Sequence, residues 1–431
     1  MKNNLITGIL YATILLSSCS KELNTIPTES VDANIALKTS DDVKGALVGA
    51  YSDLGNADFF GGRIFLEADL LANVSDFSWG GTYQQLTQIS NKAIPVDNSF
   101  VANAWLAGYR AINDANNVLN SISVVDAKDA ASVAGQAKFI RGASYFELVK
   151  RFAKAWNDGD PAANLGVPIV LTPTTLITEE NKVKRNTVAE VYQQAIKDLT
   201  DAEASSDNPA AAAAILARVY LQQGDYTLAV QAAERAITES GAKLTPTYAE
   251  AFGAANTSED IFAIQVTATS GTQGFNEFYD ANQRGDITIN DDYISSFETG
   301  DDRANLFSDG YSLKFSELYG NVHTIRLAEM LLVRAESNFR LNTAVGAAPV
   351  DDINAIRERA LLTPYTAAEL TLDDILKERR FELAFEGFAL DDIKRLQESV
   401  ASLPWNSPKL IFPIPKREIL ANGNLVQNEG Y

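Results

Sequence analysis

Apolar residues recur at helical spacing along most of the chain. A polar cluster that resembles a helix N-cap, residues 40–42, is followed by apolar residues three and four positions apart. The same spacing runs through residues 101–122 and 134–152. It is broken at residues 165–171 (LGVPIVL), which we interpret as an extended connection. The pattern therefore predicts a mainly α-helical protein.

Residues 214–237 have the pattern of a helical hairpin. Small and aromatic residues recur there at the spacing of a tetratricopeptide repeat: Ala217, Tyr220, Gly224, Tyr226, Ala229, Ala233 and Ala236. Gly224-Asp225 would form the turn between two closely packed antiparallel helices. Helix pairs at 105–151, 187–220 and 322–360 are interpreted as degenerate versions. Because one repeat cannot bury its apolar face alone, we expect neighbouring helices to stack on the hairpin, at about 210–240.

The pattern changes after residue 256. Residues 261–267 and 286–290 are typical of short strands, with Gly- and Asp-rich loops between them. Helical spacing resumes at Thr324 and continues to about Val400. The prediction is a tetratricopeptide-like helical-repeat scaffold with an irregular, loop-rich lobe and a few short strands.

Two folded regions follow from this division of the chain. An N-terminal helical region is expected at 41–256 and a C-terminal region at 257–431. Within the second region, the tail from Lys409 to Glu418 contains two prolines and is expected to be extended.

Residues 1–18 have the features of a bacterial lipoprotein signal peptide. A short basic start precedes an apolar run that is too short to span a bilayer. Leu16-Ser17-Ser18-Cys19 has the form of a lipobox, which implies cleavage before Cys19 and acylation, with palmitate as an expected chain. Several acyl chains on one residue hold a protein firmly to a membrane. We expect a lipidated tether at 19–40, with an incidental buried cysteine as the alternative.

Charge and composition exclude several classes of function. The net charge is −20 and there is no basic patch, so a nucleic-acid partner is not expected. The single histidine, His323, and the single cysteine leave no residues for Ser-His-Asp or Cys-His catalysis or for a His-based zinc site. His323 is expected to be structural. An all-oxygen calcium site at Asp301-Asp302 remains an alternative, although we expect no metal and no cofactor.

Three glutamates repeat every four residues at Glu378, Glu382 and Glu386. On one helix they would share a face and repel each other unless cations lie nearby. The candidate cations are Arg334, Arg357, Arg359, Arg379 and Arg380. We interpret the set as a structural ionic network, with the acid/base pair of a glycosidase as the alternative.

The same segment carries a family resemblance. ERRFELAFEGFALDDIKRL, residues 378–396, closely resembles the ERR-x-E-L-x-F-E-G-x-R-x-x-D-L-x-R signature of the SusD/RagB family of Bacteroidetes nutrient-binding lipoproteins. Three further stretches agree with the family in order: IRLAEMLLVRAES (325–337), INAIRERA (353–360) and the tail from residue 412. Ser20-Lys21-Glu22 is also similar to the signals that send such lipoproteins to the outer face of the outer membrane. Ala389 stands where the signature usually has arginine. Without that cation, we expect Lys394 or Arg395 to neutralise the carboxylates of Glu386 and Asp392.

The resemblance implies a function as well as a fold. It implies a non-enzymatic, cell-surface protein that captures a glycan or oligosaccharide and acts as the lid of a SusC-like TonB-dependent β-barrel transporter. Some members of the family handle peptides instead, so a peptide ligand is one alternative. A carboxylate-dependent glycosidase and a helical-repeat scaffold without a ligand are two others.

Sugar rings bind to exposed aromatic side chains surrounded by amides and carboxylates. DFSWGGTYQQL, residues 76–86, places Trp79 and Tyr83 in a Gly-Gly loop beside Asp76, Gln84 and Gln85. We predict an aromatic platform there, against the alternative that these rings anchor the loop to the core. A second candidate lies in residues 272–286, with Phe275, Phe278 and Tyr279. Trp105 is expected in the core, whereas Trp156 and Trp405 lie in connecting sequence, where either could be half-buried.

Overall fold

The computed structural model describes residues 37–175, 178–269, 271 and 273–431. The predicted signal peptide, Cys19 and nearly all of the tether lie outside these residues. Within them, no helix has both the length and the apolar character needed to cross a membrane.

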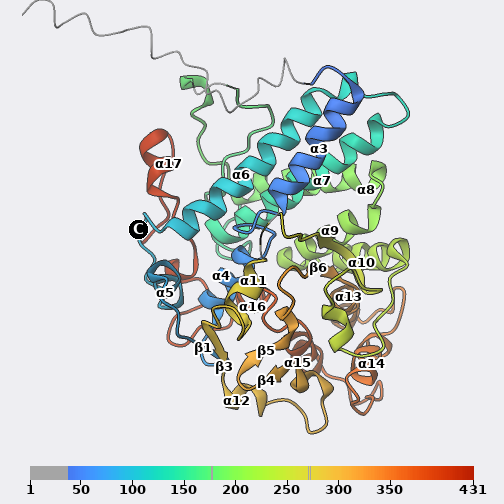
Figure 1. Ribbon diagram of the computed structural model, residues 1–431. Helices are drawn as coiled ribbons and strands as arrows, with labels where there is room; N and C mark the ends of the chain where they lie inside the picture. The colour runs from blue at the N-terminus through green and yellow to red at the C-terminus, as the bar shows by residue number, and fades with distance from the viewer. Residues whose placement is uncertain (1–36, 176–177, 270, 272) are drawn as a thin grey trace, which may run out of the picture.

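Helices packed on one another form the upper and central part of the molecule, with α6 to the left of α7 and α8 in the view of Figure 1. Consecutive helices pack on each other from α6 to α10, α3 packs on α6 and α7, and α10 packs on α13. This arrangement is a helical-repeat stack, as the apolar spacing predicts. The helices are α3 (Ser40–Leu54), α6 (Ser99–Asn120), α7 (Ala130–Phe152), α8 (Val188–Ser205), α9 (Pro209–Gln223), α10 (Tyr226–Ser240) and α13 (Leu327–Leu341).

The predicted hairpin is confirmed at α9 and α10. The Asn208 side chain accepts a hydrogen bond from a backbone N–H of the first turn, and Pro209 occupies that turn, where its missing N–H costs nothing. Gly224 ends α9 in the left-handed conformation, with φ of 73°, and Asp225 caps α10. The turn is therefore specified by adjacent residues alone.

The remaining helices cover the C-terminal region and its junction with the scaffold. They are α4 (Arg63–Ala72), α5 (Gln84–Ser90), α11 (Gly274–Tyr279), α12 (Asp291–Ile294), α14 (Pro349–Arg359), α15 (Leu372–Glu382), α16 (Ala389–Leu396) and α17 (Lys416–Ala421). Short 3-10 turns lie at Ile122–Val124, Glu179–Asn181, Ala249–Phe252, Asp302–Leu306, Leu313–Phe315 and Pro408–Leu410. One hydrophobic cluster runs from Val43 to Leu425, so both predicted regions share a core. Trp105 lies in it and is 3% exposed, as expected.

The described strands form three antiparallel pairs. They are β1 (Phe77–Trp79) with β3 (Ile287–Ile289), β2 (Asp260–Ile264) with β6 (Val322–Arg326), and β4 (Phe307–Ser308) with β5 (Tyr311–Ser312). The two strands expected near 261–267 and 286–290 are present as β2 and β3. The prediction that helix resumes at Thr324 is wrong, because Thr324 lies in β6, whose pairing with β2 delays the helix to Leu327. The tail is extended only between the 3-10 turn at Pro408–Leu410 and Pro415, after which α17 begins, with the Lys416 N–H bonded to the Val96 carbonyl (2.8 Å).

Candidate functional site

Trp79 is held at the edge of the β1–β3 pair. It pairs with Ile287, and the next residue, Gly80, donates its N–H to the Asp286 carbonyl (2.8 Å). The indole Nε1 donates to Thr87 Oγ1 (2.9 Å), and the ring lies 5.9 Å from that of Phe278. A Cβ added at Gly81 would be 2.3 Å from the indole, so only glycine fits over this part of the ring. The indole is therefore fixed in place and half-buried.

Tyr83 lies beside it, just before α5, and is 37% exposed. Its ring packs on Phe100 and on Phe278, with centroids 5.5 and 6.1 Å away. The guanidinium carbon of Arg284 lies 4.3 Å from the Tyr83 centroid, a cation–π distance. Arg284 is oriented by two bonds, from Nε to Asp286 Oδ2 (2.7 Å) and from Nη2 to Thr82 Oγ1 (2.9 Å). Trp79, Tyr83 and Arg284 thus form one surface, which we call the aromatic edge.

The structure contradicts the exposed platform expected at residues 272–286. Phe275, Phe278 and Tyr279 are 4%, 0% and 0% exposed, because they form the apolar face of α11. Their i, i+3, i+4 spacing is the sequence signal of that helix. Phe278 instead supports the aromatic edge from below. The candidate site residue that sequence reasoning missed in this segment is Arg284, whose placement depends on contacts with Thr82 and Tyr83, far away in the chain.

The polar residues predicted beside Trp79 are separated in the structure. Gln84 is exposed at the first position of α5, next to Tyr83. Asp76 faces another element, because it accepts from Nη2 of Arg380 on α15 at 2.8 and 3.0 Å. Trp156 and Trp405 are half-buried, as expected.

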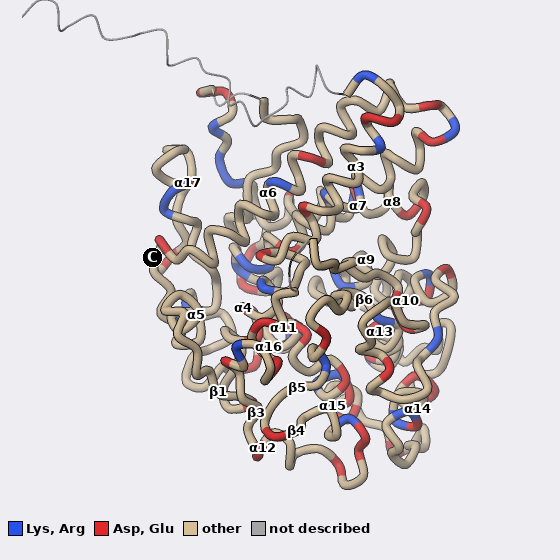
Figure 2. The backbone as a smooth tube through the Cα atoms, in the orientation of Figure 1, with Lys and Arg blue, Asp and Glu red and all other residues tan. Residues whose placement is uncertain are grey.

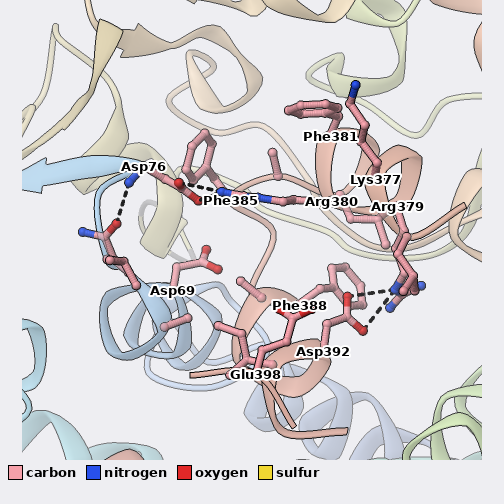
Figure 3. A pocket seen from close by; sticks show the side chains of 18 of the residues that line it. Asp69, Asp76, Lys377, Arg379, Arg380, Phe381, Phe385, Phe388, Asp392 and Glu398 are labelled. Carbon is pink, nitrogen blue, oxygen red and sulfur yellow. Dashed lines mark hydrogen bonds and ion pairs between the residues drawn. The ribbon is translucent and has the colours of Figure 1, made fainter. Parts of the chain in front are cut away.

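A cavity of about 700 Å³ opens on the other side of Asp76, between α4, α15 and α16 (Figure 3). Asp69 of α4 lies in its wall and accepts the Gly387 N–H (3.1 Å) and the Tyr279 hydroxyl (3.4 Å). Burial raises the pKa of Asp69 to about 8, and the Gly387 hydrogen bond offsets only part of that effect. The side chain is therefore largely a neutral carboxyl group at pH 7.

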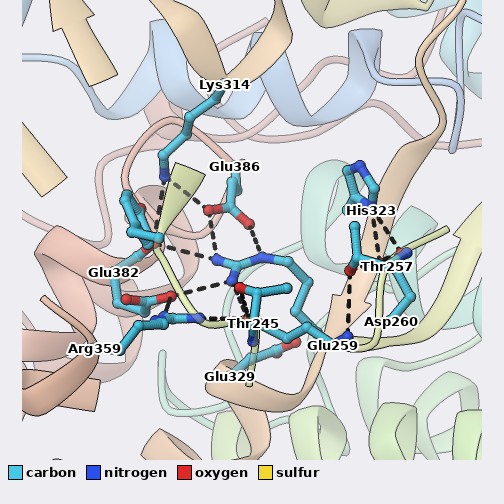
Figure 4. A network of polar contacts seen from close by, with 12 residues as sticks. Thr245, Thr257, Glu259, Asp260, Lys314, His323, Glu329, Arg359, Glu382 and Glu386 are labelled. Carbon is cyan, nitrogen blue, oxygen red and sulfur yellow. Dashed lines mark hydrogen bonds and ion pairs between the residues drawn. The ribbon is translucent and has the colours of Figure 1, made fainter. Parts of the chain in front are cut away.

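The glutamate repeat belongs to a buried ionic network (Figure 4). Glu382 accepts from Arg359 Nη2 (2.5 Å) and Arg326 Nη1 (3.1 Å). Burial raises the pKa of Glu382, but Arg359, Arg326 and Arg303 more than offset it and hold the pKa at about 2. Acidic and basic positions are interspersed around α13 and α15 (Figure 2). The structural interpretation of the glutamates is confirmed.

The network differs in detail from the prediction. Helix α15 ends at Glu382, and Phe385 and Gly387 have φ of 64° and 86°, so Glu386 is not stacked on the same helix. Glu386 pairs with Arg326 and Lys314 instead of Lys394 or Arg395, whereas Asp392 does pair with Arg395. The expected arginines at 357 and 359 contact the glutamates, but those at 334, 379 and 380 pair with other carboxylates.

Residues suited to acid/base or metal chemistry are engaged elsewhere. His323 is structural, since its Nδ1 contacts Asp260 (2.9 Å) and its Nε2 contacts the Gly253 carbonyl (2.9 Å). Asp301, in the candidate calcium loop, accepts two bonds from the Arg303 guanidinium. Across the residues that the structure describes, no group of three or more His, Cys, Asp or Glu side chains could hold a metal ion.

Comparisons with known proteins agree with the fold. A family described as starch-binding and associating with the outer membrane matches residues 46–221, and the SusD family matches residues 304–407. SusD-like protein P2 from Formosa agariphila is 26% identical over 521 aligned residues that cover both chains fully. A putative sugar binding protein from Bacteroides vulgatus is 27% identical, with a TM-score of 0.82 over 92% of this chain and 99% of that one. Surface glycan-binding protein A from Bacteroides thetaiotaomicron, 19% identical with a TM-score of 0.74 over 91% and 100%, shares the fold.

Proposed function

This chain belongs to the SusD/RagB family, and we propose that it is a cell-surface lipoprotein that binds a glycan at the aromatic edge. The observation that carries the proposal is the arrangement of Trp79, Tyr83 and Arg284. Two aromatic rings with partly exposed surfaces are fixed from below by Phe278, and a guanidinium lies over one of them. Rigid rings lose little entropy when a sugar stacks on them.

The polar groups around these rings suit a hydroxylated ligand. Arg284 is held in place by Asp286 and Thr82, so its remaining N–H groups are oriented before a ligand arrives. The exposed Gln84 amide adds a donor and an acceptor next to Tyr83. A peptide could stack on the same rings, but the family that matches residues 46–221 is described as starch-binding and the relative from Bacteroides vulgatus as a putative sugar binding protein, which favours a glycan.

We propose that the protein acts without catalysis, as the capture subunit of a SusC-like TonB-dependent transporter. The ionic network supports this role, because its carboxylates are buried in ion pairs and unavailable as acid and base. The lipobox at Cys19 would supply the membrane anchor. Cys19→Ala should move the protein from the membrane fraction to the soluble fraction, and a variant that stays membrane-bound and surface-displayed would contradict the anchor.

The ligand class is tested by affinity electrophoresis of the full chain in detergent against neutral polysaccharides and peptides. Retardation by at least one polysaccharide, with no release of reducing ends, is expected. Retardation by peptides alone would favour the peptide alternative, and release of reducing ends would favour the glycosidase. If no member of the panel retards the protein, the helical scaffold without a ligand is the better account.

A further inference from the structure

The stretch of chain that carries both rings of the aromatic edge has no charged side chain. Residues 77–91, FSWGGTYQQLTQISN, contain no Asp, Glu, Lys or Arg, although 21% of the whole chain is charged. Its exposed side chains include Ser78, Thr82 and Gln84, which form hydrogen bonds as neutral groups. This stretch therefore gives the aromatic edge a polar but uncharged surface, to which Arg284 is added from another segment.

The positive charge of Arg284 is balanced by Asp286. The Asp286 carboxylate accepts from Arg284 Nε at 2.7 Å, and the two side chains are 31% and 11% exposed for Arg284 and Asp286. The same carboxylate is next to the indole, because a Cβ added at Gly81 would be 2.7 Å from Asp286 Oδ2 and 2.3 Å from the ring of Trp79. A sugar stacked on Trp79 would therefore lie close to the negative member of this ion pair as well as to the positive one.

A second group of charges lies on the other side of Tyr83. The Phe100 ring packs on Tyr83, with centroids 5.5 Å apart, and the guanidinium carbon of Arg63 lies 5.9 Å from the Phe100 centroid. Arg63 is bonded to two carboxylates, those of Asp58 (2.6 Å) and Glu277 (2.8 Å). This group has one cation and two anions, so it offers an acidic ligand no excess of positive charge.

The cations that flank residues 77–91 are directed elsewhere. Lys92, just beyond the C-terminal end of α5, donates to the backbone carbonyls of Asn73 (2.7 Å) and Ser90 (2.9 Å). At the other end of the stretch, Arg380 is paired with Asp76. The protein as a whole carries a net charge of −20, which repels an approaching polyanion.

We propose that the aromatic edge selects neutral glycans over acidic ones, and that Asp286 sets this selectivity; the inference rests on the proposed function of the aromatic edge as a glycan site. An unpaired guanidinium is well suited to a carboxylate or sulfate group. Because Asp286 already pairs with Arg284, an acidic sugar gains no net attraction there and is repelled by the Asp286 carboxylate. A neutral sugar still stacks on the rings and accepts hydrogen bonds from Arg284.

The test uses two ethers of each polysaccharide in the electrophoresis panel, with starch, dextran and cellulose included. The carboxymethyl ether carries negative charges, and the hydroxyethyl ether carries neutral groups of similar size. The full chain in detergent is titrated with both ethers by calorimetry. The hydroxyethyl ether should bind at least about 10-fold more tightly at about 0.01 M salt. The difference should shrink at about 0.3 M NaCl, because salt screens charge repulsion but not steric hindrance.

Asp286→Asn tests the role of this residue through the ratio of the two affinities. Asparagine keeps an oxygen that can accept from Arg284 Nε, so the variant mainly removes the negative charge. Relative to the hydroxyethyl ether, the carboxymethyl ether should gain at least about 5-fold in affinity at low salt. Asp351→Asn is the matched control, since it removes an exposed carboxylate from α14, which lies far from β1 and α5 (Figure 1). It should leave the ratio unchanged.

The outcomes separate this inference from the proposed function. Equal or tighter binding of the carboxymethyl ether by the unmodified protein would overturn the selectivity while leaving the glycan site in place. An unchanged ratio in Asp286→Asn would overturn the role of Asp286. If neither ether of any polysaccharide binds, the proposed function itself is contradicted, and the selectivity falls with it.

Discussion

Asp69→Asn should change how the stability of this protein depends on pH. Asp69 is 3% exposed, and burial raises its pKa from 3.8 to about 8 in the folded protein. Because the folded-state pKa is the higher one, the protonated carboxyl favours folding. Its stabilising contribution is complete below about pH 4 and is lost progressively as the pH rises towards 8. Asparagine cannot ionise and keeps an oxygen that can accept the Gly387 N–H.

The size of this change in unfolding free energy follows from the pKa shift of Asp69. Each pKa unit corresponds to about 1.4 kcal/mol, so the unmodified protein should lose up to about 4 kcal/mol of unfolding free energy relative to Asp69→Asn between pH 5 and pH 8. Urea unfolding of both proteins at several pH values measures this difference. Asp291→Asn, at an exposed aspartate of α12, is the control, and its unfolding free energy should differ from that of the unmodified protein by the same amount at every pH. A constant difference for Asp69→Asn too would refute the reasoning that burial keeps this carboxyl neutral.

Two further perturbations test the ionic network and the repeat turn. Glu382→Gln leaves Arg326 and Arg359 with less compensating charge in a buried site and should cost about 3–5 kcal/mol in urea unfolding; a cost below about 1 kcal/mol would show that the network contributes little. Gly224→Ala places a methyl group in open space but at a φ of 73°, which is strained for alanine. The variant should therefore lose about 1 kcal/mol of unfolding free energy from backbone strain alone. A raised melting temperature would contradict the assigned turn.

The elements specified by neighbouring residues were the ones predictable from sequence. The α9–α10 hairpin depends on Asn208, Gly224 and Asp225, which act within one turn of their own helices. The strand β6 was mistaken for a helix start because its conformation depends on β2, far away in the chain. The end of α15 at Glu382 was missed for a similar reason, since Phe385 adopts its unusual conformation among aromatic residues of other segments.

The aromatic edge was predicted only in part. Sequence composition singled out Trp79 and Tyr83 in a glycine-containing loop, but it could not show that Phe278 supports both rings. It also could not place Arg284 over Tyr83, since the two residues meet only in the folded chain. The cavity was not anticipated, because the residues that line it come from several separate segments.

The central claim, that a glycan binds at the aromatic edge, is tested most directly by one calorimetric comparison. The full chain, Trp79→Ala and Trp405→Ala are titrated with the polysaccharide that gives the strongest retardation. Trp405 is a matched control because it is also half-buried but lies outside the aromatic edge. Trp79→Ala should weaken binding by at least about 10-fold, as expected for loss of an aromatic contact, while Trp405→Ala binds as the unmodified protein does. Equal affinity of Trp79→Ala and the unmodified chain would contradict the account.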